Sequence, residues 1–150
     1  MLAYAHGIGD APLLGDTIGE ALRKTAARLG DKEALVARAQ GWRATWRELW
    51  DETSAVARGL IAYGIDRGDR VGIWSPNRYE WVVTQLACAR VGAILVNLNP
   101  AYKTAEIEYA LAQSTTRLLV HARAFRASDY AAMVAEVRPR LPTLHRTICL

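Results

Sequence analysis

The segment from Gly68 to Leu111 constrains the fold of this 150-residue chain more than any other stretch. It reads GDRVGIWSPNRYEWVVTQLACARVGAILVNLNPAYKTAEIEYAL. Two short apolar runs, 70–75 and 93–98, are each followed by a turn containing proline and then by a segment with helical spacing of apolar residues. Such runs are typical of parallel strands that are buried on both faces. The segment therefore predicts an α/β fold.

The same alternation continues on both sides of this segment. It predicts an incomplete parallel sheet of the doubly wound type with flanking helices, preceded by one helix and a short β-hairpin. The expected sheet strands are 70–75, 93–98, 117–121 and 146–150, the hairpin strands are 33–38 and 42–46, and the expected helices are 18–29, 46–63, 78–91, 104–113 and 128–138.

Three helix starts carry the spacing of a capping box, in which a small polar residue precedes a glutamate by three positions. The pairs are Thr17 with Glu20, Thr45 with Glu48, and Asn77 with Glu80. Thr104 is the expected cap of the next helix. An apolar and aromatic stripe in the second helix, which includes Trp46, Trp50 and Ile61, is interpreted as core.

The chain divides into a lead and one larger unit. Residues 1–16 contain several glycines and a proline without periodicity, which predicts an extended lead. Residues 17–150 are long enough to bury roughly 70% of the surface of their unfolded form. Because the run from Arg146 to Leu150 is an apolar strand with no helix behind it, we expect 17–150 to be the N-terminal part of a domain that is truncated on its C-terminal side.

Charge and composition argue against several classes of protein. The net charge is +4, but the arginines are scattered singly, which argues against a nucleic-acid surface. The apolar stretch Trp81–Leu98 is interrupted by Arg90 and Gly92, which argues against a membrane span. Cys88 and Cys149 are expected to be buried free thiols in a reducing compartment, the cytoplasm.

The sequence lacks the common signatures of phosphate binding and hydrolysis. It contains no Gly-Lys-Ser or Gly-Lys-Thr, no GxSxG and no HExxH, and Pro12 stands where a dinucleotide fingerprint needs its third glycine. His6, His121 and His145 have no evident partners, and Ser114–Thr116 is interpreted as a turn. We therefore predict no catalytic, cofactor-binding or metal-binding residue in this chain.

Two segments carry a family resemblance. TWRELWDETSAVARGLIAYGIDRGDRVGIWSPNRYEWV closely resembles the opening of the adenylate-forming superfamily, and ARVGAILVNLNPAYKTAEIEYAL resembles its second core motif. The second segment and the lead YAHGIGDAPLLGDTIGEAL are most similar to the medium- and long-chain fatty acyl-CoA synthetase branch.

The resemblance implies an activity for the full-length enzyme. Members of the family join a carboxylate to AMP using ATP and Mg²⁺, and then transfer the acyl group to coenzyme A. The groups that perform this chemistry lie beyond the equivalent of Leu150. For this sequence the resemblance implies only structural elements. The match to residues 90–102 implies a strand and a turn that is shaped by residues 97–100. Residues 1–33 are a candidate dimer segment.

Three interpretations stay open at this point. The chain is the N-terminal part of a fatty acyl-CoA ligase and is inactive alone. Alternatively, it is a truncated, non-catalytic partner that docks on a full-length synthetase through the unpaired strand at 146–150. In the third interpretation it is a small nucleotide-binding module that uses the strand-turn-helix at Ser75–Asn77.

Overall fold

The computed structural model describes residues 7, 9 and 13–150. Its helices are α1 (Ile18–Leu29), α2 (Trp46–Ala62), α3 (Tyr79–Val91), α4 (Thr104–Gln113) and α5 (Tyr130–Val137). Its strands are β1 (Glu33–Ala37), β2 (Trp42–Thr45), β3 (Arg70–Trp74), β4 (Ile94–Asn97), β5 (Leu118–His121), β6 (Ala124–Phe125), β7 (Ser128–Asp129) and β8 (Arg146–Cys149). Short 3₁₀ turns cover Arg38–Gln40 and Arg138–Arg140. Most of the expected lead, residues 1–16, and His6 within it lie outside the described residues.

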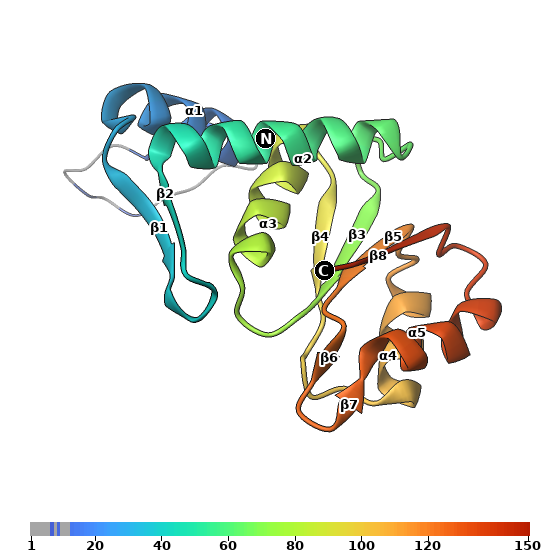
Figure 1. Cartoon of the computed structure of the whole chain (residues 1–150). Helices are drawn as coiled ribbons and strands as arrows, with labels where there is room; N and C mark the ends of the chain where they lie inside the picture. Colours follow the sequence, from blue (N-terminus) through green and yellow to red (C-terminus); the bar gives the residue numbers. More distant parts are fainter. Residues whose placement is uncertain (1–6, 8, 10–12) are drawn as a thin grey trace, which may run out of the picture.

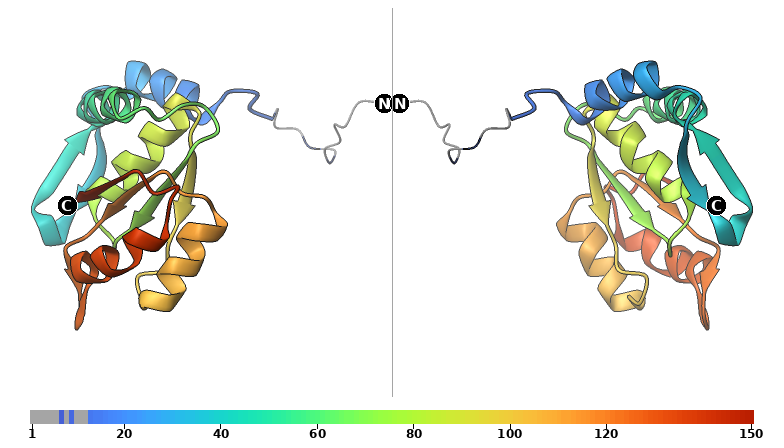
Figure 2. Two further views of the ribbon diagram at one scale, coloured as in Figure 1. Left: turned by 90° about the vertical axis from the view of Figure 1, so that its right-hand side faces the viewer. Right: turned by 90° about the vertical axis from the view of Figure 1, so that its left-hand side faces the viewer.

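A parallel sheet of four strands, in the order β4-β3-β5-β8, is the centre of the fold. Helices α2 and α3 cover one face of this sheet, and α4 and α5 cover the other, as Figures 1 and 2 show. The hairpin β1-β2 is antiparallel and packs against α2 and α3. The expected α/β architecture is therefore confirmed.

Alternation along the two central strands explains why both faces carry helices. Val71 and Ile73 on β3 and Val120 on β5 point toward α2 and α3, whereas Trp74 and Leu119 point toward α4 and α5. All five side chains are buried. A strand that is apolar on both faces gains stability only when both are removed from water, at about 25 cal/mol per Å² of apolar surface.

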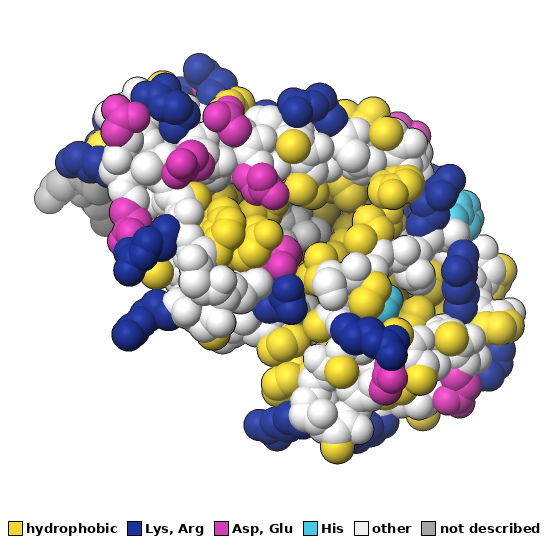
Figure 3. Space-filling model, in the orientation of Figure 1, with side chains coloured by type: hydrophobic (Ala, Val, Ile, Leu, Met, Phe, Trp, Pro, Cys, Tyr) yellow, Lys and Arg dark blue, Asp and Glu magenta, His cyan; other side chains and the backbone are white. Residues whose placement is uncertain are grey.

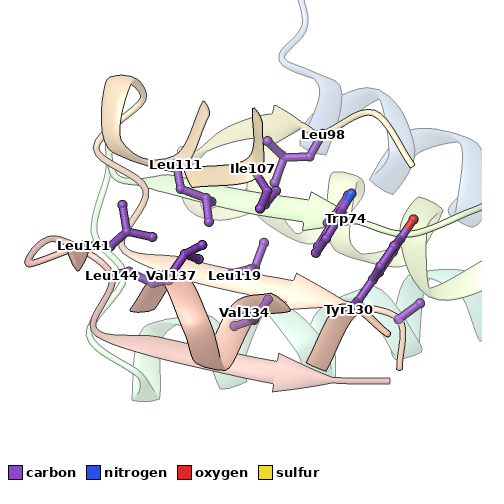
Figure 4. Close-up of a cluster of buried hydrophobic side chains, with 11 residues drawn as sticks. Trp74, Leu98, Ile107, Leu111, Leu119, Tyr130, Val134, Val137, Leu141 and Leu144 are labelled. Atoms are coloured by element: carbon purple, nitrogen blue, oxygen red, sulfur yellow. The ribbon is translucent and has the colours of Figure 1, made fainter. Parts of the chain in front are cut away.

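The core on the α4 and α5 side is organised around Trp74, which Figure 4 shows beside Tyr130. Their rings stack with centroids 3.6 Å apart and an angle of 6° between the planes. The Trp74 indole Nε1 donates to the carbonyl oxygen of Asn99 at 3.0 Å, and the Tyr130 hydroxyl donates to that of Pro100. Both polar ends of this stacked pair therefore hold the chain segment that follows β4.

The helix starts match the expected capping only in part. At α2 the box is complete, because Glu48 N donates to Thr45 Oγ1 at 3.2 Å and Thr45 N donates to a Glu48 carboxylate oxygen at 2.8 Å. At α1, Thr17 Oγ1 accepts from Glu20 N, but the Glu20 carboxylate pairs with Arg23 instead.

The caps expected at the next two helices are wrong. Arg78, not Asn77, precedes α3, and the backbone N–H of Tyr79 donates to the Gln40 side-chain oxygen at 2.9 Å. At α4, Lys103 is the cap position and its N–H donates to Glu106 at 2.8 Å, so Thr104 is already helical.

Other local expectations also need correction. The segment expected to begin a helix at Ser128 first forms the small hairpin β6-β7, and Asp129 then caps α5 by accepting from Ala132 N at 3.0 Å. Ile61, assigned to the core stripe of α2, is 60% exposed. Cys88 is buried as expected, but Cys149 is exposed because it lies on the edge strand β8.

Arg90 fixes the position of α3 against α2. Its guanidinium lies over the Trp50 ring, 3.6 Å from the centroid, and donates to Ser54 Oγ at 2.6 Å and to the carbonyl oxygen of Trp50 at 3.2 Å. In the part of the chain that the structure describes, no helix has both the length and the apolarity to cross a membrane.

Thr53 gives a test of the α2 packing. Its hydroxyl is fully buried and finds no hydrogen-bond partner among the described residues. Since an unsatisfied buried polar group costs about 1–3 kcal/mol, Thr53→Val should raise the free energy of unfolding by about 1 kcal/mol or more. Urea denaturation measures this change. Thr53→Ser, which keeps the hydroxyl and removes the methyl group, is the control and should destabilise; a destabilised Thr53→Val variant would contradict the packing described.

Candidate functional site

The carboxyl edge of the parallel sheet is the first place to look for a site, because ligands of open α/β sheets bind there. The segments after β3 and β4 form one half of this edge, and the ends of β5 and β8 form the other. Ala101 N donates to Asn99 Oδ1 at 2.9 Å, and Ser75 Oγ donates to the carbonyl oxygen of Pro76 at 2.9 Å. Trp74 and Tyr130 donate to the carbonyl oxygens of Asn99 and Pro100. The polar side chains at this edge therefore stabilise the turns of the protein itself.

The N-terminus of α3 adjoins this edge and is already occupied. Gln40 of the hairpin turn accepts from Tyr79 N, and its amide nitrogen donates to a Glu80 carboxylate oxygen at 2.9 Å. Arg78 pairs with the same carboxylate at 2.6 Å. A helix N-terminus that holds a negative side chain disfavours a phosphate at the same place.

Glu80 is charged at neutral pH. Partial burial by itself raises the pKa of Glu80, but the hydrogen bonds from Arg78 and Gln40 outweigh burial and hold this pKa below its usual value. The arrangement at Ser75–Asn77 therefore has the form of a strand-turn-helix in which Gln40 takes the N–H of Tyr79 and Glu80 places a negative charge at the helix start.

The two histidines of the described residues, His121 and His145, do not converge on any of these groups. His121 is buried at the end of β5, with Nδ1 2.8 Å from the carbonyl oxygen of Ala122. Burial lowers the pKa of His121, so the ring is neutral near pH 7. His145 is exposed in the turn before β8. Between residues 13 and 150, no three His, Cys, Asp or Glu residues gather in a way that could hold a metal ion.

The thiols and the hydroxyl-rich turn have structural roles or lie alone. Burial raises the pKa of Cys88 to about 12, which leaves the thiol protonated and unreactive. Ser114–Thr116 forms the expected turn, with Thr115 at a φ of 50°. The Arg70 guanidinium donates to the Ser114 carbonyl oxygen at 2.9 Å, so the turn is held by the protein itself.

An apolar groove of about 250 Å³ lies at the β8 side of the sheet and is here called the sheet-edge groove. Its walls are α2 and α3 and its floor is β5, β8 and Leu150. It is lined by Glu52, Val56, Gly59, Leu60, Tyr63, Tyr79, Glu80, Val83, Thr84, Val120, Ile148 and Leu150. Figure 3 shows hydrophobic side chains gathered in this hollow below α2.

The groove has an apolar interior and a charged rim. Val83, Val120 and Leu60 at its bottom are buried, whereas Glu52 on the rim is exposed. Arg146 lies over the Tyr63 ring, 5.1 Å from the centroid, at the β8 side. No thiol or histidine lines the groove, so its chemistry suits the burial of apolar groups rather than catalysis.

Comparison with known proteins identifies the protein family of this chain. Residues 22–150 match the model of the family described as AMP-binding enzyme. The chain belongs to the AMP-binding enzyme family. This result confirms the resemblance to adenylate-forming enzymes that the two sequence motifs carry.

The relatives of this AMP-binding chain are acyl-CoA ligases. It is 39% identical over 141 residues to the mitochondrial medium-chain acyl-CoA ligase ACSF2 of Danio rerio, covering 94% of this chain and 23% of the relative. It is 40% identical over 140 residues to the Mus musculus protein of the same name, covering 93% of this chain and 23% of the relative. The chain thus spans less than a quarter of the length of these relatives.

Solved structures agree with the family assignment. A candidate long-chain fatty-acid CoA ligase from Rhodopseudomonas palustris superposes with a TM-score of 0.81 at 30% identity, covering 90% of this chain and 33% of that one. The N-terminal domain of FACL13 from Mycobacterium tuberculosis has the same fold, with a TM-score of 0.82 at 24% identity, and this chain covers 33% of it.

The structure shows which features of this AMP-binding chain the sequence reasoning missed. The cap from Gln40 depends on a contact between residues 39 positions apart, which no local pattern reveals. The groove residues Gly59, Val83 and Ile148 come from three separate elements, α2, α3 and β8. A signal for the groove was available in α2, where Val56, Gly59 and Tyr63 share one helix face at spacings of three and four.

Gln40 provides a test of the α3 cap. Gln40→Ala removes the acceptor for Tyr79 N, and loss of a helix cap costs about 1 kcal/mol. We expect a lower free energy of unfolding by about that amount in urea denaturation. Arg38→Ala changes an exposed side chain in the same turn and should have little effect. Equal effects of the two substitutions would argue against the cap.

Proposed function

We propose that this chain is the N-terminal structural part of an ATP-dependent acyl-CoA ligase. The observation that carries the proposal is the family match over residues 22–150, combined with relatives named as acyl-CoA ligases, of which the match covers only 23%. The reaction proposed for the whole enzyme is the joining of a fatty acid to AMP, with release of pyrophosphate, and then transfer of the acyl group to the coenzyme A thiol with release of AMP.

The described residues do not fit ATP, Mg²⁺ or coenzyme A as a site of their own. The carboxyl edge of the sheet uses its polar groups internally, and the N-terminus of α3 holds Glu80. We therefore place the binding of these cofactors in the polypeptide that the relatives have beyond the matched region, and we derive no catalytic step from this chain. Its own contribution is the parallel sheet and the fixed turn after β4.

The substrate of the whole enzyme is proposed to be a medium-chain fatty acid. Support comes from the names of the zebrafish and mouse relatives, which are medium-chain ligases, although a structural relative is titled a long-chain one. The expected cytoplasmic location stays a proposal, since the same relatives are named as mitochondrial.

The domain division and the dimer segment also stay proposals. Residues 17–150 would form the N-terminal part of the large AMP-binding domain, behind a lead of residues 1–16. The candidate dimer segment, residues 1–33, includes α1 and residues outside the described ranges. Exposed Leu13, Leu14 and Ile18 support it, because apolar side chains of this size favour burial.

Docking on a full-length synthetase as a non-catalytic partner is a second candidate function. The observation that favours it is the combination of the edge strand β8 with the adjoining apolar groove. The nucleotide-binding module is less well supported, because Gln40 already satisfies the N–H of Tyr79 that a phosphate would use.

The proposed function predicts no turnover by the 150 residues alone and turnover by a completed chain. In a chimera, this chain replaces the matched 23% of the mouse relative. We expect fatty-acid-dependent exchange of pyrophosphate into ATP by the chimera and none by the isolated chain, with the mouse enzyme as positive control. Exchange by the isolated chain, or a folded chimera without exchange, would contradict the proposal.

A further inference from the structure

We propose that the amino edge of the parallel sheet is a docking surface for an acidic segment of another polypeptide, in which carboxylates lie between aliphatic side chains. The centre of this surface, here called the amino-edge row, is formed by Ile94, Arg70, Arg117 and Arg146. These residues lie at, or immediately before, the starts of the neighbouring strands β4, β3, β5 and β8. The inference does not depend on the proposed ligase activity.

Parallel pairing brings the residues of the row together, although they are far apart in the sequence. Arg70 pairs with Ile94 in register, Arg117 N donates to the carbonyl oxygen of Arg70 at 2.9 Å, and Arg146 N donates to that of Arg117 at 3.3 Å. Since neighbouring strands lie about 4.8 Å apart, the row spans about 14 Å across the sheet. Arginines that stand singly in the sequence therefore become neighbours, because all four strands run in the same direction.

Two guanidinium groups of the row are held by neutral groups rather than by carboxylates. Arg70 donates to the carbonyl oxygen of Ser114 at 2.9 Å, and Arg146 lies over the Tyr63 ring. Neither forms an ion pair with a carboxylate of the described residues. Their positive charges are fixed in place before any partner binds, which reduces the entropy cost of binding an anionic group.

The other arginines at this edge leave an excess of positive charge. Arg117 pairs with Asp69 at 2.7 Å, and the charge of Arg70 acts on the same carboxylate. Arg138 extends the surface, because it donates to the carbonyl oxygen of His145, just before β8, at 3.3 Å. In the part of the chain that the structure describes, Arg138 forms no ion pair. The edge as a whole therefore attracts carboxylates.

Each end of the row carries an exposed apolar side chain. Ile94 on β4 is 53% exposed, and Tyr63, beside Arg146 at the other end, is 47% exposed. Apolar side chains of this size favour burial against a partner. An arrangement of cations between two apolar groups is complementary to carboxylates between two aliphatic side chains.

Negative charges at the same edge distinguish a polypeptide from other anionic partners. Asp66 and Asp69 precede β3, and a continuous anionic surface, such as a lipid bilayer or a nucleic-acid backbone, would be repelled by them. A polypeptide can place its carboxylates opposite the arginines and neutral groups opposite the aspartates. The Tyr63 ring, which could stack on a base, is covered by Arg146.

Internal connections of the chain form the amino edge. Residues 64–69, 92–93, 114–117 and 141–145 lead into the four strands, and all of them are described. Ligands of open α/β sheets bind at the opposite, carboxyl edge. A partner at the amino edge therefore leaves the ligand-binding edge of the sheet free.

Fluorescence anisotropy tests this docking surface with a labelled peptide that has three glutamates between two leucines and blocked ends. The 150-residue chain should bind it. Arg138→Gln combined with Arg146→Gln should weaken binding at least about fivefold, because both lost charges belong to the surface. The matched control, Arg28→Gln combined with Arg38→Gln, removes the same net charge at exposed positions outside the surface and should change binding by less than about twofold.

Three results would overturn the proposal. Equal weakening by the two double variants would show attraction to net charge alone. Absence of binding at peptide concentrations up to about 1 mM would show that the edge has no affinity for such a segment. Tighter binding of phosphatidylglycerol-containing vesicles, or of a short single-stranded oligonucleotide, with the same loss in the Arg138→Gln and Arg146→Gln variant, would identify another class of partner.

Amide chemical shifts give a second readout that needs no substitution. In the chain that carries its natural arginines, the peptide should shift the amide signals of Ile94, Arg70 and Arg117, whereas the same peptide with glutamines in place of glutamates should not. Shifts confined to other parts of the chain would contradict docking at the amino edge. The chimera with the mouse relative should bind the peptide within about threefold of the isolated chain, and loss of binding there would also overturn the proposal.

Discussion

Burial of β3 and β5 on both faces is the constraint on which the rest of this structure depends. Val71, Ile73 and Val120 need α2 and α3 above them, and Trp74 and Leu119 need α4 and α5 below. Neither helix layer is optional, because a strand with one bare apolar face would lose much of its stabilisation. The sheet therefore fixes where α2, α3, α4 and α5 lie, and with them the turn after β4 and the groove beside β8.

The same packing uses polar groups at the carboxyl edge of the described sheet to hold that edge together. Trp74 and Tyr130 use their polar atoms to hold the carbonyls of Asn99 and Pro100, and Gln40 reaches from the hairpin to cap α3. These bonds stabilise the carboxyl edge by satisfying its backbone groups internally. The sheet belongs to the AMP-binding family, but a fold does not by itself assign a function to particular residues. The polar groups named here stabilise the structure of this part.

At the groove, by contrast, the described residues include features that lower the stability of the isolated chain. Gly59 weakens α2, and Ile148 and Leu150 stay half-exposed on an edge strand. Both features are unfavourable for the described residues considered alone. They become favourable when another segment packs against them, which is the physical reason that the groove favours docking as the second candidate function.

The sequence by itself determined the order and type of the main elements and the family. Alternating apolar runs and helical spacings are local signals, and they located the parallel strands, the main helices and the first hairpin within a few residues. The motifs at residues 45–82 and 89–111 are also contiguous, so the family could be recognised without a structure. Local signals were weaker at helix starts, where Asn77 and Thr104 were the expected caps but Gln40 and Glu106 supply the bonds.

Only the tertiary structure decided which side chains meet across distant segments. The cap from Gln40, the stack of Trp74 on Tyr130 and the exposure of Cys149 on the edge strand depend on strand order and packing, which no short window of sequence contains. The groove likewise exists because α2, α3 and β8 converge, although they are separated in the chain. Periodicity sets which face of an element is apolar, and packing alone sets what that face contacts.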